Sequence, residues 1–515
     1  MIDCKKEVAG YCLKDLPEGP VARLAEVARE AAADGMVLLE NSRGTLPLSA
    51  GDTVSVFGRG QTEYCKSGTG SGGLVNVTYV TNILDSLRAV PGIKVNETLA
   101  GIYAAYIQEH PFDKGQGWAQ EPWAQEEMPL ADATVRDARA VSEKALIVIC
   151  RTAGEDKDNS ATRGSWYLTG TEEEMIRLVT AAFDHVAVVL NVGNIMDMTW
   201  VKKYGVDAVL YGWQGGMEGG RATVDVLTGA VNPSGRLTDT IAEKIEDYPS
   251  NDHFGDRDVN LYTEDIYVGY RYFETFAPER VLYPFGYGLS YTTFAVTTKD
   301  VEMERGDDTL VTVTVSVKNT GKVAGREVVE VYLGAPQGKL GKPEKVLAAF
   351  GKTGLIAPGK TEKMQLSFLL EDFASFDDSG VTGHKNAYVL EGGQYLIYVG
   401  TDAHSAEAEA AYLLEEKVVR IAEEALTPTR AFDRLHPDAE GKPTWEPTPT
   451  RTYDVAARIR DRRPAGIPYT GDRSLKLVDV RDGRATMEEF IAQLSDRELI
   501  EICRGEGMST PTVTP

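Results

Sequence analysis

Short apolar runs that alternate with helix-patterned segments are the feature that most constrains the fold of this chain. Between residues 20 and 240, four runs are apolar enough to form buried strands, at 53–57, 145–150, 185–190 and 206–211. Helical periodicity occupies the intervals, at 21–32, 82–90, 172–183 and 219–227. Thr171 with Glu174 fits a capping box for the third of these helices. Strands that alternate with helices predict an α/β domain with a mainly parallel sheet.

The hydrophobic pattern changes at about residue 296. Apolar residues then recur at every second position, at 311–317, 329–333, 364–368 and 395–399. A period of two is typical of strands that bury one face, and turn residues such as Asn319-Thr320-Gly321 separate the runs. We therefore expect an α/β domain with a junction segment over 21–295, followed by an antiparallel β-sandwich of immunoglobulin or fibronectin-III type over 296–415.

The remaining segments carry weaker patterns. Residues 1–20 are expected to form an N-terminal extension. Seven of the 23 prolines lie within 425–475, which predicts an extended connector over 416–484. From residue 485 a helical pattern returns, and Ser495 with Glu498 fits another capping box. Because about 30 residues cannot bury a core alone, 485–515 is expected to be the start of an incomplete further unit.

Charge and composition narrow the classes of function. Lys plus Arg is 54 and Asp plus Glu is 78, so the formal net charge of -24 argues against nucleic-acid and anionic-membrane partners. Five scattered cysteines fit reduced thiols in a cytoplasmic protein. The sequence has no CxxC and no HExxH motif, so neither a metal nor a cofactor is expected. The oligomeric state stays open, a homo-oligomer included.

Two predicted loops carry candidate chemistry because they follow predicted parallel strands, where α/β sheets place their sites. The loop at 151–159 holds three acids, Glu155, Asp156 and Asp158. It either delivers a carboxyl group for acid/base work or is a solvated acidic turn, and composition alone favours the turn. The loop at 58–73 is rich in glycine and serine. A dinucleotide fingerprint, GxGxxG, would need a third glycine where this loop has Glu63. Backbone groups of such a loop can approach a polar ligand closely.

A third segment concentrates aromatic residues. Residues 262–273 contain five of them, which either flank a sugar or pack at a domain junction. The glycine-rich stretch at 284–291 supports the junction, because it lies where the α/β pattern gives way to the sandwich pattern.

The order and wording of these segments resemble glycoside hydrolase family 3, of the β-glucosidase type. The resemblance covers nearly all of residues 20–415 and rests on DGMVLLENSRGTLPL, KSGTGSGG, RTAGEDKD, LYGWQGGMEGGRATVDVLTGAVNPSGRL, YTEDIYVGYRYFET and YPFGYGLSYTTF. It implies an α/β sandwich that carries an acid/base glutamate, then a fibronectin-III-like domain. It also implies hydrolysis of terminal β-linked glucosyl residues.

The domain order departs from most of that family. Most members begin with a (β/α)8-type barrel that holds the nucleophilic aspartate. Here 485–508 resembles the start of that barrel, placed after the sandwich. The resemblance thus implies a swapped order and a C-terminally truncated chain that lacks the nucleophile.

Site residues follow from the resemblance, position by position. Glu155 matches the acid/base glutamate, with Asp156 or Asp158 as alternatives. Ser67, Gly68 and Ser71 would flank the sugar, and Asp158 matches a nearby family aspartate. The expected partner is a β-glucoside or a short β-gluco-oligosaccharide. Loss of the barrel also leaves open a non-catalytic carbohydrate-binding or scaffold module.

Overall fold

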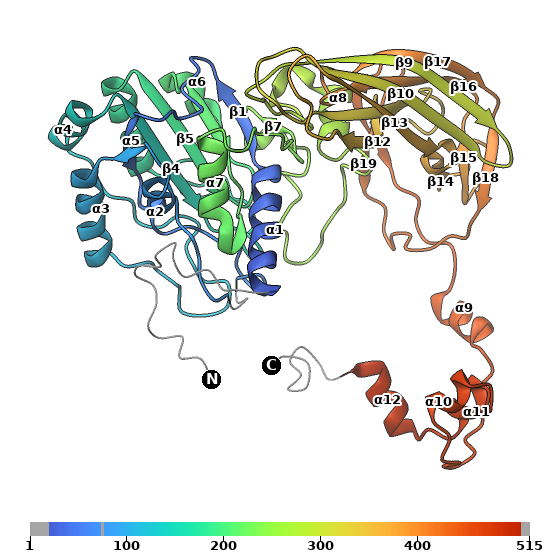
Figure 1. Ribbon diagram of the computed structural model, residues 1–515. Coiled ribbons are helices and arrows are strands. Elements are labelled where there is room, and N and C mark those ends of the chain that lie inside the picture. The colour runs from blue at the N-terminus through green and yellow to red at the C-terminus, as the bar shows by residue number, and fades with distance from the viewer. Residues whose placement is uncertain (1–19, 74–76, 506–515) are drawn as a thin grey trace. The chain divides into compact units, whose positions relative to one another are not determined.

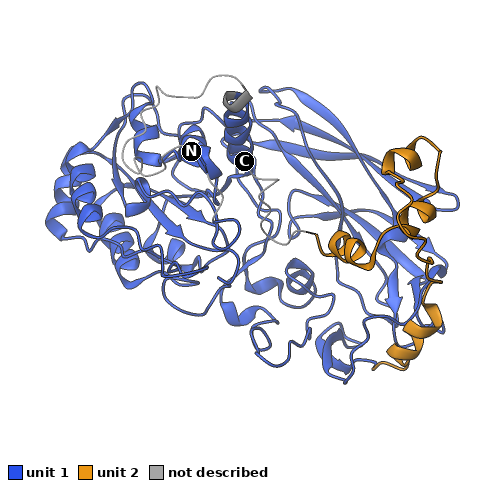
Figure 2. Ribbon diagram, turned by 90° about the horizontal axis from the view of Figure 1, so that it is seen from below, with its two compact units in different colours: residues 1–449 blue, residues 450–515 orange. Residues whose placement is uncertain are grey.

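The computed structural model describes residues 20–73 and 77–505, and the chain forms two compact units, residues 1–449 and 450–515 (Figure 2). Residues 1–19 of the predicted extension and residues 506–515 lie outside the described part. The first unit contains an α/β domain and a β-sandwich (Figure 1).

The α/β domain is built on a six-stranded sheet with the order β1-β6-β5-β4-β2-β3. Its strands are β1 (Val37–Asn41), β2 (Thr53–Phe57), β3 (Lys94–Val95), β4 (Lys144–Arg151), β5 (His185–Val192) and β6 (Ala208–Tyr211). All neighbours are parallel except β1, which pairs antiparallel with β6. The predicted mainly parallel sheet is therefore confirmed.

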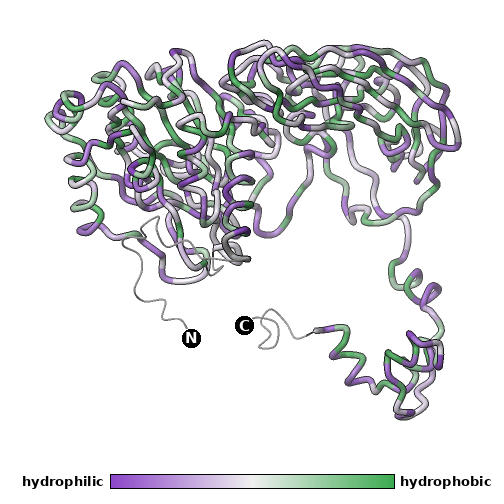
Figure 3. Tube along the Cα trace, viewed as in Figure 1, coloured by the Kyte–Doolittle hydropathy of each residue, from purple (hydrophilic) through white to green (hydrophobic). Residues whose placement is uncertain are grey.

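Helices cover both faces of this sheet, because alternate residues of each strand point to opposite sides. One core joins the sheet to α3 (Glu97–Glu109), α4 (Asp132–Val141), α5 (Gly170–Ala182) and α6 (Thr199–Tyr204). The other core joins it to α1 (Pro20–Gly35), α2 (Ile83–Arg88) and α7 (Gly219–Leu227). Figure 3 colours the central strands mostly green, which is the signature of strands buried on both faces.

The capping prediction for α5 was wrong by two residues. The capping box is formed by Thr169 and Glu172, not by Thr171 and Glu174. Glu174 instead pairs with Arg177 on the exposed face of the helix. The helix begins earlier because Glu172 is buried, where its carboxylate both caps the helix and binds Arg151 from β4.

The second domain is an antiparallel sandwich, as the period of two predicts. One sheet has the order β13-β10-β9, with β9 (Phe294–Arg305), β10 (Thr309–Asn319) and β13 (Thr361–Leu369). The other has the order β12-β11-β16-β17, with β11 (Val328–Gly334), β12 (Val346–Lys352), β16 (Gly393–Gly400) and β17 (Glu407–Leu414). The alternating residues of both sheets form one core. A small extra sheet contains β14 (Ser375–Asp377), β15 (Ala387–Leu390) and β18 (Lys417–Ile421).

The aromatic segment at 262–273 packs where the two domains meet. It ends within α8 (Tyr270–Phe276). Along the chain this helix lies between the short strands β7 (Ile241–Ala242) and β8 (Val281–Tyr283), which pair with each other. The Tyr270 ring stacks on Phe285 and meets the edge of Tyr332 of β11. The Leu347 amide of the sandwich donates a hydrogen bond of 2.8 Å to the Tyr270 hydroxyl. These contacts are those of a packed junction.

The segment predicted as an extended connector contains secondary structure. Strands β19 (Asp433–Pro437) and β20 (Pro443–Pro447) form a hairpin, and α9 (Val455–Arg462) follows. The hairpin is held by Arg434, which binds Asp378 and Glu446. Local sequence could not reveal this, because Asp378 is 56 residues away.

The second unit is helical in its described part. It contains α9, α10 (Leu477–Arg481), α11 (Met487–Ala492) and α12 (Asp496–Arg504). The predicted capping box of Ser495 and Glu498 opens α12. Over residues 20–73 and 77–505, no helix has the length and apolar character that crossing a membrane requires.

Candidate active site

Two loops interlock at the carboxyl edge of the sheet. The loop at 58–73 follows β2 and the loop at 152–168 follows β4. The Thr69 amide donates to the Ala153 carbonyl oxygen at 2.8 Å, and the Thr69 hydroxyl donates to the Glu155 carbonyl oxygen at 2.8 Å. A β-carbon on Gly68 would lie 2.3 Å from the Ala153 oxygen, so this approach requires glycine.

The Glu155 carboxylate is held by Ser71 from the other loop. Its Oε2 atom accepts hydrogen bonds from the Ser71 amide at 2.9 Å and from the Ser71 hydroxyl at 2.8 Å. Gly70 lies beneath it with φ +69°, and a β-carbon there would be 2.6 Å from Oε2. Both Glu155 and Ser71 are exposed. The fold thus brings a carboxylate and a glycine-serine turn together at an open rim.

The electrostatics of Glu155 favour its ionised form. Hydrogen bonds from the Ser71 amide and hydroxyl lower the pKa of Glu155 from its ordinary value. A proton donor needs the opposite shift, a raised pKa that keeps the group protonated near neutral pH. In this environment Glu155 is therefore an ionised carboxylate and not a proton donor.

The other predicted site residues lie on the same two loops. Ser67 is half-buried and accepts a hydrogen bond of 3.2 Å from Lys66. Asp156 and Asp158 are both exposed. The Lys157 ammonium lies 4.8 Å from the centre of the Trp123 ring, which ties the acidic loop to a third segment of the chain. The structure thus brings Ser71 against the Glu155 carboxylate and Gly68 against the backbone of Ala153 and Gly154, whereas no contact joins Ser67 or Asp158 to Glu155 among the described hydrogen bonds.

Beneath the rim lies a floor of buried polar side chains at the end of β4. The Arg151 guanidinium makes two hydrogen bonds to the Glu172 carboxylate, of 2.6 and 2.7 Å. Asn191 of β5 pairs with Cys150 of β4 in the sheet. Its side chain accepts a hydrogen bond from the Cys65 amide at 2.7 Å and donates one to the Cys65 carbonyl oxygen at 3.0 Å. These contacts fix the base of both loops on the sheet.

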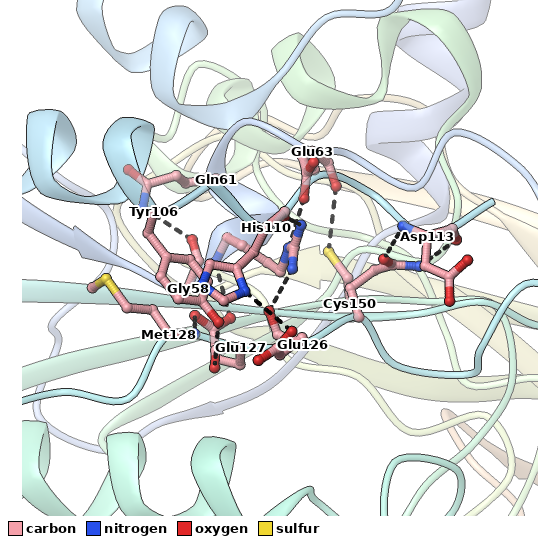
Figure 4. A network of polar contacts seen from close by, with 12 residues as sticks. Gly58, Gln61, Glu63, Tyr106, His110, Asp113, Glu126, Glu127, Met128 and Cys150 are labelled. Atoms are coloured by element: carbon pink, nitrogen blue, oxygen red, sulfur yellow. Dashed lines mark hydrogen bonds and ion pairs between the residues drawn. The ribbon is translucent and has the colours of Figure 1, made fainter. Parts of the chain in front are cut away.

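A second buried network lies under the first half of the glycine-rich loop (Figure 4). The Glu127 carboxylate accepts from the Arg59 amide at 2.9 Å and from the Met128 amide at 2.7 Å. Burial raises the pKa of Glu127 to about 7, although the two amides oppose the shift. The Arg59 side chain reaches Glu63 at 2.6 Å and the His110 carbonyl oxygen at 2.8 Å.

Two family models match the chain in the order of its two domains. Residues 36–291 match the glycosyl hydrolase family 3 C-terminal domain, and residues 327–403 match the fibronectin type III-like domain. The chain belongs to glycoside hydrolase family 3.

Named relatives within family 3 agree with this assignment. The chain is 49% identical to a β-glucosidase of Ruminococcus albus, over 95% of this chain and 51% of that protein. It is 37% identical to β-glucosidase A of Butyrivibrio fibrisolvens, over 93% of this chain and 64% of that protein. The chain therefore spans about half the length of the first of these curated relatives.

Solved structures of β-glucosidases share the fold of this chain. A β-glucosidase of Paenibacillus barengoltzii is 51% identical with a TM-score of 0.93, over 98% of this chain and 56% of that one. β-Glucosidase 3B of Thermotoga neapolitana, solved in complex with glucose, is 36% identical with a TM-score of 0.70, over 78% of this chain and 55% of that one.

Sequence reasoning about this family 3 chain missed the floor of the site. Asn191 carried a signal, since it is a polar residue at the end of an otherwise apolar run. The Arg151–Glu172 pair and the contact of Glu127 with Arg59 carried none, because these partners are 21 and 68 positions apart in the sequence. Across the part of the chain that the structure describes, no group of three or more His, Cys, Asp or Glu residues is placed to hold a metal ion.

Proposed function

We propose that this chain is the acid/base-bearing part of a retaining β-glucosidase and that Glu155 is its acid/base residue. The observation that carries the proposal is the Glu155 carboxylate at the carboxyl edge of the sheet, held on a glycine-serine turn of the second loop. The named β-glucosidase relatives support the substrate class, a β-glucoside or short β-gluco-oligosaccharide.

The reaction assigns Glu155 two successive roles. As an acid it protonates the glycosidic oxygen while the bond to the anomeric carbon breaks; as a base it then takes a proton from the water that releases the sugar. The first role needs a higher pKa than the one its contacts with Ser71 produce. We therefore propose that assembly of the complete site removes water from Glu155 or separates it from Ser71, so that its pKa rises.

The second carboxylate of the reaction is proposed to come from polypeptide outside these 515 residues. A retaining site needs a nucleophile about 5–5.5 Å from the acid/base group. We propose that it lies on a (β/α)8-type barrel that begins near residue 485, in swapped order after the sandwich. The chain's coverage of only 51% of the R. albus protein leaves room for such a domain. Ser67, Gly68, Ser71 and Asp158 are proposed to border the sugar.

A leaving-group comparison tests the role of Glu155. A polypeptide that extends through the predicted barrel should hydrolyse cellobiose and aryl β-glucosides. Glu155→Gln should lose about 10²–10⁴-fold on cellobiose, the usual worth of general acid catalysis. It should lose far less in the first step on an aryl glucoside whose leaving group needs no proton, and azide should restore turnover in the second step.

Matched variants separate Glu155 from its neighbours. Asp156→Asn and Asp158→Asn remove the other two acids of the loop and should leave the leaving-group dependence unchanged. If either variant instead reproduces the Glu155→Gln pattern, the acid/base assignment moves to that residue. If the 515-residue chain alone matches the extended polypeptide in rate, the proposed location of the nucleophile is wrong.

The alternative is a non-catalytic carbohydrate-binding or scaffold module, which would need no proton donor at Glu155. Calorimetry of the 515-residue chain with glucose and cellobiose distinguishes the two. Tight binding by this chain alone supports the module, whereas an incomplete enzyme should bind weakly until its barrel is present.

A further inference from the structure

Two cysteines that are 85 positions apart in the sequence lie together under the interlocked loops. Cys65 belongs to the glycine-rich loop, and Cys150 is the penultimate residue of β4. Both contact the Asn191 carboxamide oxygen, through the Cys65 amide at 2.7 Å and the Cys150 sulfur at 3.4 Å. The Cys65 and Cys150 side chains are also close enough for each to shift the pKa of the other. The Asn191 carboxamide thus brings the Cys65 backbone and the Cys150 sulfur to one point under the loops.

The two cysteines share a small cavity. Both cysteines are partly exposed and line one small cavity, together with Arg59, Glu63, Glu127 and Glu172. The cavity is about 10 Å³, which is room for a single water-sized molecule. The cavity therefore has room for a molecule close to the size of water and none for a bulky oxidant.

The two thiols are not equivalent. The hydrogen bond from Cys150 lowers the pKa of Cys65, and Arg151 adds to that shift while burial and Glu63 oppose it. The hydrogen bond to Cys65, together with burial, raises the pKa of Cys150. Cys65 is therefore the more nucleophilic partner, because the thiolate is the reactive form.

We propose that Cys65 and Cys150 are a redox-active pair that a hydroperoxide converts into a disulfide, which ties the glycine-rich loop to the strand that delivers Glu155. The Cys65 thiolate attacks a peroxide oxygen, so that the O–O bond breaks and Cys65 becomes a sulfenic acid. The Cys150 thiol then attacks that sulfur, the S–S bond forms and water leaves. Two thiols and one hydrogen peroxide give one disulfide and two waters.

The position of this bond gives it a consequence for the site. Cys65 lies two residues before Ser67 and six before Ser71, while Cys150 lies five residues before Glu155. The side-chain contact between Ser71 and Glu155 is exposed at the rim, and beneath it the two loops are joined by hydrogen bonds from Thr69 to the Ala153 and Glu155 carbonyl oxygens. A covalent link at the floor restricts how far the two loops separate.

Mass spectrometry of the 515-residue chain tests the proposal. The reduced protein is treated with hydrogen peroxide, blocked with N-ethylmaleimide and digested without reductant. We expect a linked peptide pair containing Cys65 and Cys150, lighter by two hydrogen atoms than the two free peptides, and its loss after dithiothreitol. Separate alkylation of both peptides, or a link from Cys65 to any other cysteine, would overturn the proposal.

Variants and amide exchange test the mechanism. Cys150→Ala should lose the link and leave a Cys65 sulfenic acid that dimedone traps, whereas Cys503→Ala, at an exposed cysteine, should keep the link. Absence of the dimedone adduct would contradict the role of Cys65. In the wild-type chain, oxidation should slow amide exchange over residues 66–71 and 151–155, and unchanged exchange would contradict the tie between the loops.

Discussion

The exposed rim of this site and the buried networks beneath it, which we together call the floor, shift the pKa values of their carboxylates in opposite directions. At the rim, Glu155 is exposed and two donors on Ser71 lower its pKa. At the floor, Glu127 also accepts two hydrogen bonds, yet burial raises its pKa to about 7. A perturbed pKa is therefore not by itself a mark of catalysis, because Glu127 is shifted by the burial that holds the loop in place.

The buried and the exposed carboxylates also differ in their expected contribution to stability. Glu172 and Arg151 are nearly inaccessible, at 5% and 1% side-chain exposure, so their pairing is part of the folded core. The Glu155 side chain, in contrast, is open to solvent. The comparison predicts that changes at the floor alter stability, whereas changes at the rim alter chemistry.

The largest effect is expected at the floor. Arg151→Ala leaves the Glu172 carboxylate buried without its partner, which should lower the free energy of unfolding by about 3–5 kcal/mol. The exposed pair of Arg177 and Glu174 gives a matched control, and Arg177→Ala should lower the free energy of unfolding far less than Arg151→Ala, because solvent screens an exposed pair. Urea unfolding measures both. Equal losses in the two variants would break the distinction between floor and rim.

A smaller effect is expected from the titration of Glu127. Glu127 has a pKa of about 7 in the folded state and an ordinary value of 4.5. Between these two pH values the folded state therefore keeps a proton that the unfolded state has released. The stabilising contribution of Glu127 is therefore complete below pH 4.5 and is lost as the pH rises through about 7, by about 3 kcal/mol in total. Glu127→Gln should flatten this part of the stability profile. An unchanged slope between pH 4.5 and 7 would show that another group titrates.

The smallest effect is expected at the rim. Ser71→Ala removes one of the two donors to Glu155, so the pKa of Glu155 should rise toward its ordinary value while stability barely changes. Carbon-detected NMR titration of the Glu155 carboxyl measures the shift. Ser67→Ala, on the same loop, serves as the control and should leave that titration unaltered. A fall in the pKa of Glu155 would refute the assigned cause.

Local pattern predicted most of the α/β elements of this chain. β2 at 53–57 and α7 at 219–227 have the predicted bounds, because buried β-branched runs and amphipathic spacing are local properties. The start of α5 and the β19–β20 hairpin were mispredicted or missed. Each depends on a distant partner, Arg151 for Glu172 in the first case and Asp378 for Arg434 in the second.

The sequence by itself determined the two domain types, the family and the identity of the acidic loop, because periodicity and motif order are properties of the linear sequence. Only the tertiary structure decided that Ser71 holds Glu155, that Cys65 meets Cys150, and that Glu127 is buried while Glu155 is not. The physical reason is that hydrogen bonds and burial act across space. The two pairs joined here, Ser71 with Glu155 and Cys65 with Cys150, are 84 and 85 positions apart, and no periodicity links such positions.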